Sequence, residues 1–334
     1  MSEASGTGDA PSAAHKADRR AELMLGALSS VVLVLIAGMV IFVLTKGWPS
    51  FANNGLAWFG SGGSVDDQLG AIFNSPANPD AYEYTLRAWP LLYATGLVTI
   101  GSVVFGLAFS LLAAIFIVEF APARLRALLE PVVRLLAAVP SVIYGLIGVL
   151  VLVPFVGNQL ISQGRKESVT FVVQLSGNSL LVAIVILTVM ITPIMIALIV
   201  DALRSVPGAW TEGAAALGAN RWRVMWTISV RAARPAIVGA AVLATARALG
   251  EAIMLSMVSG SVGFSPNPLD GLTFFFEPVR PLAATIVDNA EGLSVKPFGE
   301  TLYAFAAVLL VSSLFLSLGA WAVRQPMKRY GVRA

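Results

Sequence analysis

Cysteine is absent from this chain of 334 residues, and histidine occurs only once, as His15. Without cysteine the chain has no disulfide framework, no thiolate metal site and no cysteine nucleophile. One histidine without cysteine is a poor basis for a zinc site, so we expect His15 to be solvated and expect no metal. Charge is also scarce: charged residues make up 12% of the chain, about half of the roughly 25% typical of soluble domains.

Hydrophobic residues, by contrast, make up 57% of the chain, so most of the apolar surface must face lipid. The net charge of +3 is too small to indicate a nucleic-acid partner. No Gly-x-x-x-x-Gly-Lys-Ser/Thr loop is present to cradle ATP phosphates, and no pairing of a nucleophile with a base stands out. We therefore expect a membrane protein that is not an enzyme and that holds no cofactor of its own.

Six apolar segments are long enough to cross a bilayer core of about 30 Å as helices. An all-α membrane protein with six transmembrane helices is thus the predicted fold class. The first segment follows a polar leader, but its apolar run of about 22 residues is longer than that of a secretory signal, which favours an uncleaved anchor. The predicted spans are 24–45, 90–118, 132–156, 179–200, 236–258 and 301–322.

Lysine and arginine fall unevenly on the two sides of these spans. With a cytoplasmic N-terminus, the inner segments hold fifteen of the 22 basic residues and the outer segments six, while Arg247 lies inside a span. Positive charge is retained in the cytoplasm, so the ratio predicts that both ends are cytoplasmic. The predicted parts are a leader at 1–22, an anchor at 23–45, an outer loop at 46–89, a core at 90–322 and a basic tail at 323–334.

Two predicted outer loops, 46–89 and 259–300, are long enough to favour a functional role over a simple connection. The longest inner connection, 201–235, contains the stretch EGAAALGANRWRVMW. Glu212 to Leu217 predicts a short helix with a carboxylate in its first turn, and Gly218 would end it in a left-handed conformation. A second short helix with Trp222 on one side would follow. Composition alone leaves a partner-docking helix and a helix lying on lipid headgroups about equally favoured.

The same connection resembles the cytoplasmic signature of ABC-importer permeases, in which Glu-Ala-Ala is followed by three further residues, then Gly, and later an apolar Ile/Leu-Pro ending. The matching residues are Glu212, Ala214, Gly218 and Ile228. Two positions depart from the signature: Gly213 stands where the first alanine is usual, and Arg231 where the proline is usual. Further stretches resemble the phosphate-specific permease family PstC: AAVPSVIYG at 137–145, DALRSVP at 201–207, LGANRW at 217–222 and ARALGEAIMLSMVSG at 246–260.

This resemblance implies a MetI-like permease fold in a bacterial cytoplasmic membrane and a role in phosphate import. It implies a PstA-like second permease subunit, a dimer of a PstB-like ATPase that holds ATP and Mg²⁺, and a PstS-like phosphate-binding protein outside. The 212–218 segment would then be the coupling helix that sits in a groove of the ATPase.

Arg247 and Glu251 are the two ionisable residues in the fifth predicted span. An arginine at the bilayer centre costs about 2.5–3.5 kcal/mol on insertion scales, so a function is the default interpretation. Four residues apart on one helix, the two would share a face, and a private salt bridge is the alternative. The guanidinium fork suits phosphate oxygens, and the carboxylate can accept a hydrogen bond from a P–OH group that sulfate lacks. In the family the matching pair is regarded as essential to phosphate passage.

Ser141 and Tyr144 follow Pro140 in the third predicted span, where a kink is expected. Their hydroxyl groups either line the path or only pack against neighbours. Two other functions stay open: an ABC permease for sulfate, molybdate or an amino acid, and a secondary transporter coupled to protons through Glu251. A secondary transporter needs no docking helix for an ATPase, and the Arg247–Glu251 pair favours phosphate over the other solutes.

Overall fold

A computed structural model describes residues 10–76, 84–169, 174–263 and 265–327, and it is helical almost throughout these ranges. Parts of the predicted leader and basic tail lie outside the described residues. Within these ranges, six helices are long and apolar enough to cross a membrane, which confirms the fold class. They are built from α1 (Ala10–Asn54), α3 (Trp89–Ile115), α5 with its continuation (Ser141–Leu160), α8 (Leu180–Arg204), α10–α11 (Arg221–Leu249) and α15 (Phe298–Met327).

α8 is the most buried of these spans, and α3 packs against it through small and hydroxylated residues. Ser102 Oγ donates to the Ile184 carbonyl at 3.1 Å, and Ser110 Oγ donates to the Thr192 carbonyl at 3.1 Å. Small residues let helix backbones approach closely where lipid offers no hydrophobic driving force, and interhelical hydrogen bonds add to this packing. The core of the permease is therefore centred on α8.

α1 meets the rest of the chain only near its C-terminal end. Its large apolar side chains from Leu23 to Leu44 are exposed, as expected for a helix covered by lipid or by another subunit. In the C-terminal part of α1 that contacts the bundle, Phe42 lies edge-on to Tyr303 of α15, with ring centroids 5.7 Å apart. A Cβ on Gly47 would lie 2.8 Å from the Ala304 backbone, so glycine permits the close crossing there.

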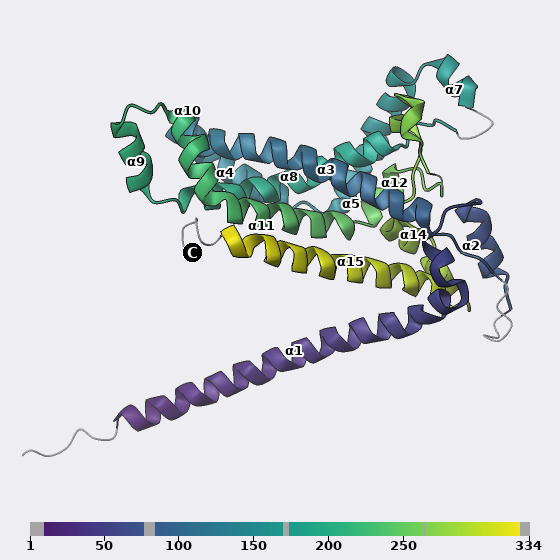
Figure 1. Cartoon of the computed structure of the whole chain (residues 1–334), viewed down its shortest axis with the longest axis horizontal. Helices are drawn as coiled ribbons and strands as arrows, with labels where there is room; N and C mark the ends of the chain where they lie inside the picture. The colour runs from purple at the N-terminus through teal and green to yellow at the C-terminus, as the bar shows by residue number, and fades with distance from the viewer. Residues whose placement is uncertain (1–9, 77–83, 170–173, 264, 328–334) are drawn as a thin grey trace, which may run out of the picture.

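Short helices gather at the two ends of the bundle (Figure 1). α9 (Gly208–Ala216) and α10 lie at the end where α15 finishes, whereas α2 (Val65–Phe73), α7 (Gln163–Val169) and α14 (Leu282–Asp288) lie at the opposite end. We call these the α9 end and the α2 end. The predicted inner and outer connections thus separate to opposite ends of the molecule.

The third span differs from its predicted bounds of 132–156. Residues Ala123–Ala137 form a separate amphipathic helix, α4, and the spanning helix begins at Ser141. Pro140 disfavours a helical conformation for the residue before it, so the chain breaks here instead of continuing. Glu130 of α4 forms an ion pair with Arg204 at the α9 end of α8. Hydropathy alone had joined part of this surface helix to the span.

The fifth span also differs from its predicted bounds of 236–258. It begins at Arg221, passes through a π-helical turn at Met225–Ser229, and ends at Leu249. Asn220 starts it, because its side-chain oxygen accepts a hydrogen bond from the Arg223 amide at 2.8 Å. The predicted second short helix of the cytoplasmic connection is therefore the beginning of this span. A separate helix, α12 (Ile253–Val258), follows after a break.

Candidate substrate path and coupling helix

The break between α11 and α12 lies at membrane depth. The Ser179 amide donates to the Val258 carbonyl at 3.2 Å, so the end of α12 is level with the start of α8. Counting back at 1.5 Å per residue puts Glu251 up to about 10 Å, and Arg247 up to about 16 Å, inside the bundle from its α2 end. Irregular backbone at such depth is tolerated where it meets protein or lines a cavity.

The break separates the two charged residues, which the continuous-helix prediction had placed one turn apart on a shared face. Arg247 belongs to the last turn of α11, whereas Glu251 lies beyond its end. One carboxylate oxygen of Glu251 accepts a hydrogen bond from the Met254 amide at 3.2 Å, within the first turn of α12. A carboxylate is favoured beside the unsatisfied amides of a helix start. The private salt bridge, which was the alternative interpretation of this pair, is absent from the described part of the chain.

Arg247 is exposed on the surface of this single chain and has no ion-pair partner among the described residues. A bare guanidinium is costly against lipid, so its surroundings must be aqueous or supplied by another subunit. Across the break, a Cβ on Gly145, next to Tyr144, would lie 3.3 Å from the Met254 backbone at the start of α12. The break that carries Glu251 therefore lies against the segment that carries Tyr144.

Tyr144 is buried, and its hydroxyl donates a 3.0 Å hydrogen bond to the Leu136 carbonyl in the last turn of α4. This bond crosses the break at Pro140, so Tyr144 has at least a structural function. Ser141 begins α5 and is half-buried, and within the described ranges its side chain forms no hydrogen bond. Of the two hydroxyl groups, that of Ser141 is the one left available to a ligand.

Two glycines of this region were not singled out from the sequence. A Cβ on Gly145 would lie 2.8 Å from the Met257 sulfur, and one on Gly148 would lie 2.6 Å from a methyl group of Val258. Both glycines therefore let α12 pack directly against the third span. Their spacing of three residues, which puts small residues on one helix face, was the available signal.

The short helix predicted at 212–217 is present as α9, which begins at Gly208 and places Glu212 in its second turn, not its first. Gly218 has φ +81°, the left-handed conformation that the sequence predicted. The Gly218 amide bonds to the Ala215 carbonyl at 2.9 Å and the Ala219 amide to the Ala214 carbonyl at 3.2 Å. This pair of bonds is the Schellman arrangement, which satisfies the last carbonyl groups of a helix.

No residue of α9 is buried, and Leu217 directly after it is 90% exposed. Trp222 of α10 instead packs edge-on against Trp226, with centroids 5.6 Å apart, and lies near Phe120 at the end of the second span. The base of the fifth span is thus anchored in the bundle while α9 projects from it. An exposed helix of small apolar residues fits a surface that another protein covers.

Comparison with known proteins agrees with this architecture. Residues 106–325 match the family described as the binding-protein-dependent transport system inner membrane component. The chain is 34% identical over 252 residues to the probable ABC transporter permease protein YqgH of Bacillus subtilis, covering 75% of this chain and 74% of that protein. It is 31% identical over 297 residues to the probable phosphate transport system permease protein PstC of Methanocaldococcus jannaschii, covering 86% of each.

Solved structures share the fold at low identity. A bacterial alginate ABC transporter, in complex with its pentasaccharide-bound periplasmic protein, contains a chain that matches with a TM-score of 0.58 at 16% identity, covering 94% of this chain and 98% of that one. A chain of the MetNI methionine ABC transporter, in an inward-facing conformation, matches with a TM-score of 0.50 at 17% identity. The match covers 72% of this chain and 96% of that one. The chain therefore belongs to the family of binding-protein-dependent inner membrane components, the permeases of ABC importers, and PstC phosphate permeases are among its relatives.

Proposed function

We propose that this chain is the permease subunit of an ATP-driven importer of inorganic phosphate. The observation that carries the proposal is Arg247, an exposed guanidinium at membrane depth that has no ion-pair partner among the described residues. Such a group needs an anion or water beside it, and a planar fork of donors matches phosphate oxygens. Several relatives are phosphate transport permeases by name, which supports this choice of anion.

Glu251 gives the proposed path its selectivity. Near neutral pH phosphate keeps at least one P–OH proton, which a carboxylate oxygen can accept as a hydrogen bond, whereas sulfate has none and is repelled. One oxygen of Glu251 is already occupied by the Met254 amide. The other remains for the substrate, and the position of the carboxylate at the start of α12 keeps it oriented. Ser141 is the candidate for an additional hydroxyl contact.

The proposed assembly places this chain in the cytoplasmic membrane with both termini and α9 in the cytoplasm. α9, with Glu212, Ala214, Ala215 and Gly218, would dock on a PstB-like ATPase dimer, in which ATP and Mg²⁺ are held. A PstA-like subunit would complete the path, and Arg247 would face the space between the two permeases. A PstS-like binding protein would dock at the α2 end.

Uptake of radiolabelled phosphate in cells that lack the gene tests the proposal. Expression of this chain with its partners should restore uptake of labelled phosphate. Excess unlabelled phosphate should inhibit this uptake, whereas excess sulfate should not. A partner ATPase unable to hydrolyse ATP is the matched control and should abolish uptake. Restored uptake of sulfate or molybdate instead would assign the permease to another solute. Phosphate uptake that persists with the inactive ATPase and follows the proton gradient would identify a secondary transporter.

A further inference from the structure

The α9 end contains a second basic feature, away from Arg247. A cavity of about 370 Å³ lies between α9 and the base of the fifth span. Its lining comes from α9, the π-helical turn and the first turns of α11, the helix that carries Arg247 near its other end. The lining residues are Trp210 of α9, Thr227 and Ile228 of the π-helical turn, and Arg231, Ala232, Arg234 and Pro235 of α11.

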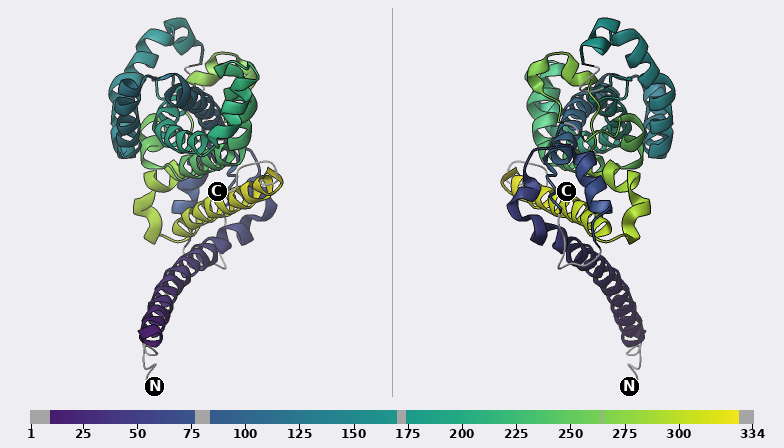
Figure 2. Two further views of the ribbon diagram at one scale, coloured as in Figure 1. Left: turned by 90° about the vertical axis from the view of Figure 1, so that its left-hand side faces the viewer. Right: turned by 90° about the vertical axis from the view of Figure 1, so that its right-hand side faces the viewer.

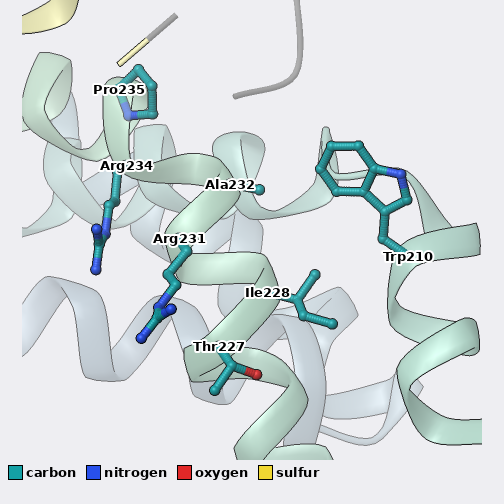
Figure 3. Close-up of a pocket in the computed structure, with 7 residues that line it drawn as sticks. All are labelled: Trp210, Thr227, Ile228, Arg231, Ala232, Arg234 and Pro235. Atoms are coloured by element: carbon teal, nitrogen blue, oxygen red, sulfur yellow. The ribbon is translucent and has the colours of Figure 1, made fainter. Parts of the chain in front are cut away.

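Arg231 and Arg234 give this cavity its charge. Figure 3 shows both side chains extending to the same side of the helix, while Ile228 extends toward Trp210. Neither arginine forms an ion pair with a described residue, and none of the seven lining residues is acidic. Like charges three residues apart on a helix repel each other, so an anion between them would relieve the repulsion.

Three acidic residues of the α9 end are paired with other arginines, whereas Glu212 of α9 forms no ion pair with a described residue. Glu130 binds Arg204 through both carboxylate oxygens, and Glu119 lies 4.0 Å from Arg221. Asp201 lies 3.7 Å from a third arginine of the same end. Within the described chain no carboxylate pairs with Arg231 or Arg234, so an anion from outside would meet two unpaired guanidinium groups.

The helix geometry separates this cavity from the proposed substrate path. Arg247 follows Arg231 by sixteen residues and Arg234 by thirteen on one α-helix. At about 100° per residue, Arg247 projects roughly 160° from Arg231 and about 140° from Arg234. The two arginines thus lie on nearly the opposite face, about 20 Å closer to the α9 end. A phosphate ion leaving Arg247 along its own face would not meet them.

We propose that Arg231 and Arg234 form a binding site for a phosphate group at the boundary between membrane and cytoplasm, separate from the transport path. Guanidinium forks bind phosphate oxygens in pairs. Trp210 and Ile228 provide an apolar wall of the kind found at headgroup depth, where aromatic residues gather. Both a phospholipid headgroup and free phosphate carry the required chemistry. A lipid bound here would brace α9 against the span that α9 is expected to move.

Native mass spectrometry of the full-length chain, released from vesicles of equal phosphatidylglycerol and phosphatidylcholine, tests the lipid source. The double variant Arg231→Gln with Arg234→Gln should lower the preference for phosphatidylglycerol about 25-fold, at roughly fivefold per arginine near a membrane surface. The control Arg124→Gln with Arg223→Gln removes two exposed arginines from the same end outside the cavity and should leave the preference unchanged.

Equilibrium binding of radiolabelled inorganic phosphate in pure phosphatidylcholine nanodiscs tests the other source. Loss of phosphate binding in the double variant alone, with lipid preference unaffected, would assign the site to free phosphate. Equal lipid preference and equal phosphate binding in wild type, double variant and control would overturn the site. The pair Arg231→Lys with Arg234→Lys keeps the charge without the fork and should give an intermediate loss, which guards against a folding defect in the glutamine variant.

Discussion

Replacement of Arg247 by glutamine is the sharpest test of the proposed path. A side chain that holds phosphate through two charge-assisted hydrogen bonds contributes about 1.5–3 kcal/mol for each bond. Loss of both bonds, about 3–6 kcal/mol, predicts a fall in phosphate uptake of about 10²- to 10⁴-fold at 1.36 kcal/mol per tenfold change. Arg247→Lys keeps the charge but loses the fork, and about a 10- to 100-fold fall is expected.

The structure also predicts that this variant assembles normally. Removing one member of a buried ion pair usually destabilises a fold, because the partner is left uncompensated. Arg247 is exposed and has no such partner in the part of the chain that the structure describes, and Glu251 accepts a hydrogen bond from the Met254 amide instead. Its replacement also removes the insertion cost of an intramembrane arginine. The amount of subunit in the membrane should therefore equal that of wild type.

The assay is initial uptake of labelled phosphate, normalised to the membrane level of the subunit by immunoblot. Arg223→Gln, an exposed arginine at the other end of the same continuous helix, is the matched control and should transport normally. The double variant Arg247→Gln with Glu251→Gln should not recover uptake. Uptake within about threefold of wild type in the assembled Arg247→Gln variant, a cost below about 0.7 kcal/mol, would refute the reasoning.

Four further predictions each concern one residue of the described structure. Glu251→Gln keeps the oxygen that accepts from the Met254 amide but loses the charge, so competition assays should show phosphate selectivity over sulfate reduced about tenfold. Gly218→Val strains a backbone at φ +81° by about 1–3 kcal/mol and should uncouple ATPase stimulation from uptake. Gly218→Asn, which tolerates this conformation, should retain coupling. Normal coupling in the valine variant would contradict the docking function of α9. Cysteine at exposed Ser64 should react with an impermeant thiol reagent added outside intact cells, and labelling of cysteine at Ser205 would overturn the topology. Burial, aided by the charge of Asp270, raises the pKa of Glu277, so the free energy of unfolding falls as pH rises through that pKa. Glu277→Gln should therefore raise the unfolding temperature at neutral pH but not near pH 4. A variant whose unfolding temperature follows the same pH profile as that of wild type would contradict this.

The spans and the coupling motif could be predicted from the sequence because each depends on local signals. Long apolar runs identify transmembrane helices, and a glycine after a run of alanines predicts the left-handed end found at Gly218. Pro140 marked the break before the third span, yet hydropathy joined part of α4 to that span. The signal was present, and a helix of mixed polarity beside a span obscured it.

The break after Leu249 could not be predicted in the same way. No proline lies there, and a single glycine inside an apolar run is usually tolerated in a helix. The chain turns because α12 packs against Gly145 and Gly148 of another span, a tertiary contact without a local signature. The residues proposed for the path were identified from the sequence, but the separation of Arg247 from Glu251 was not. Their roles in transport stay predictions.

The continuous helix from Arg221 to Leu249 has a mechanical consequence. At 1.5 Å per residue it is a lever about 43 Å long, so a tilt of about 10° at its base would carry the far end through about 7 Å. α12 would keep its position, because the Ser256 hydroxyl donates a hydrogen bond to Asp288 and the Val258 carbonyl accepts one from the Ser179 amide. The hinge falls between Arg247 and Glu251. The distance between those two side chains would therefore change each time the helix tilts. In one position both groups could bind phosphate together, and in the other they would be too far apart to do so.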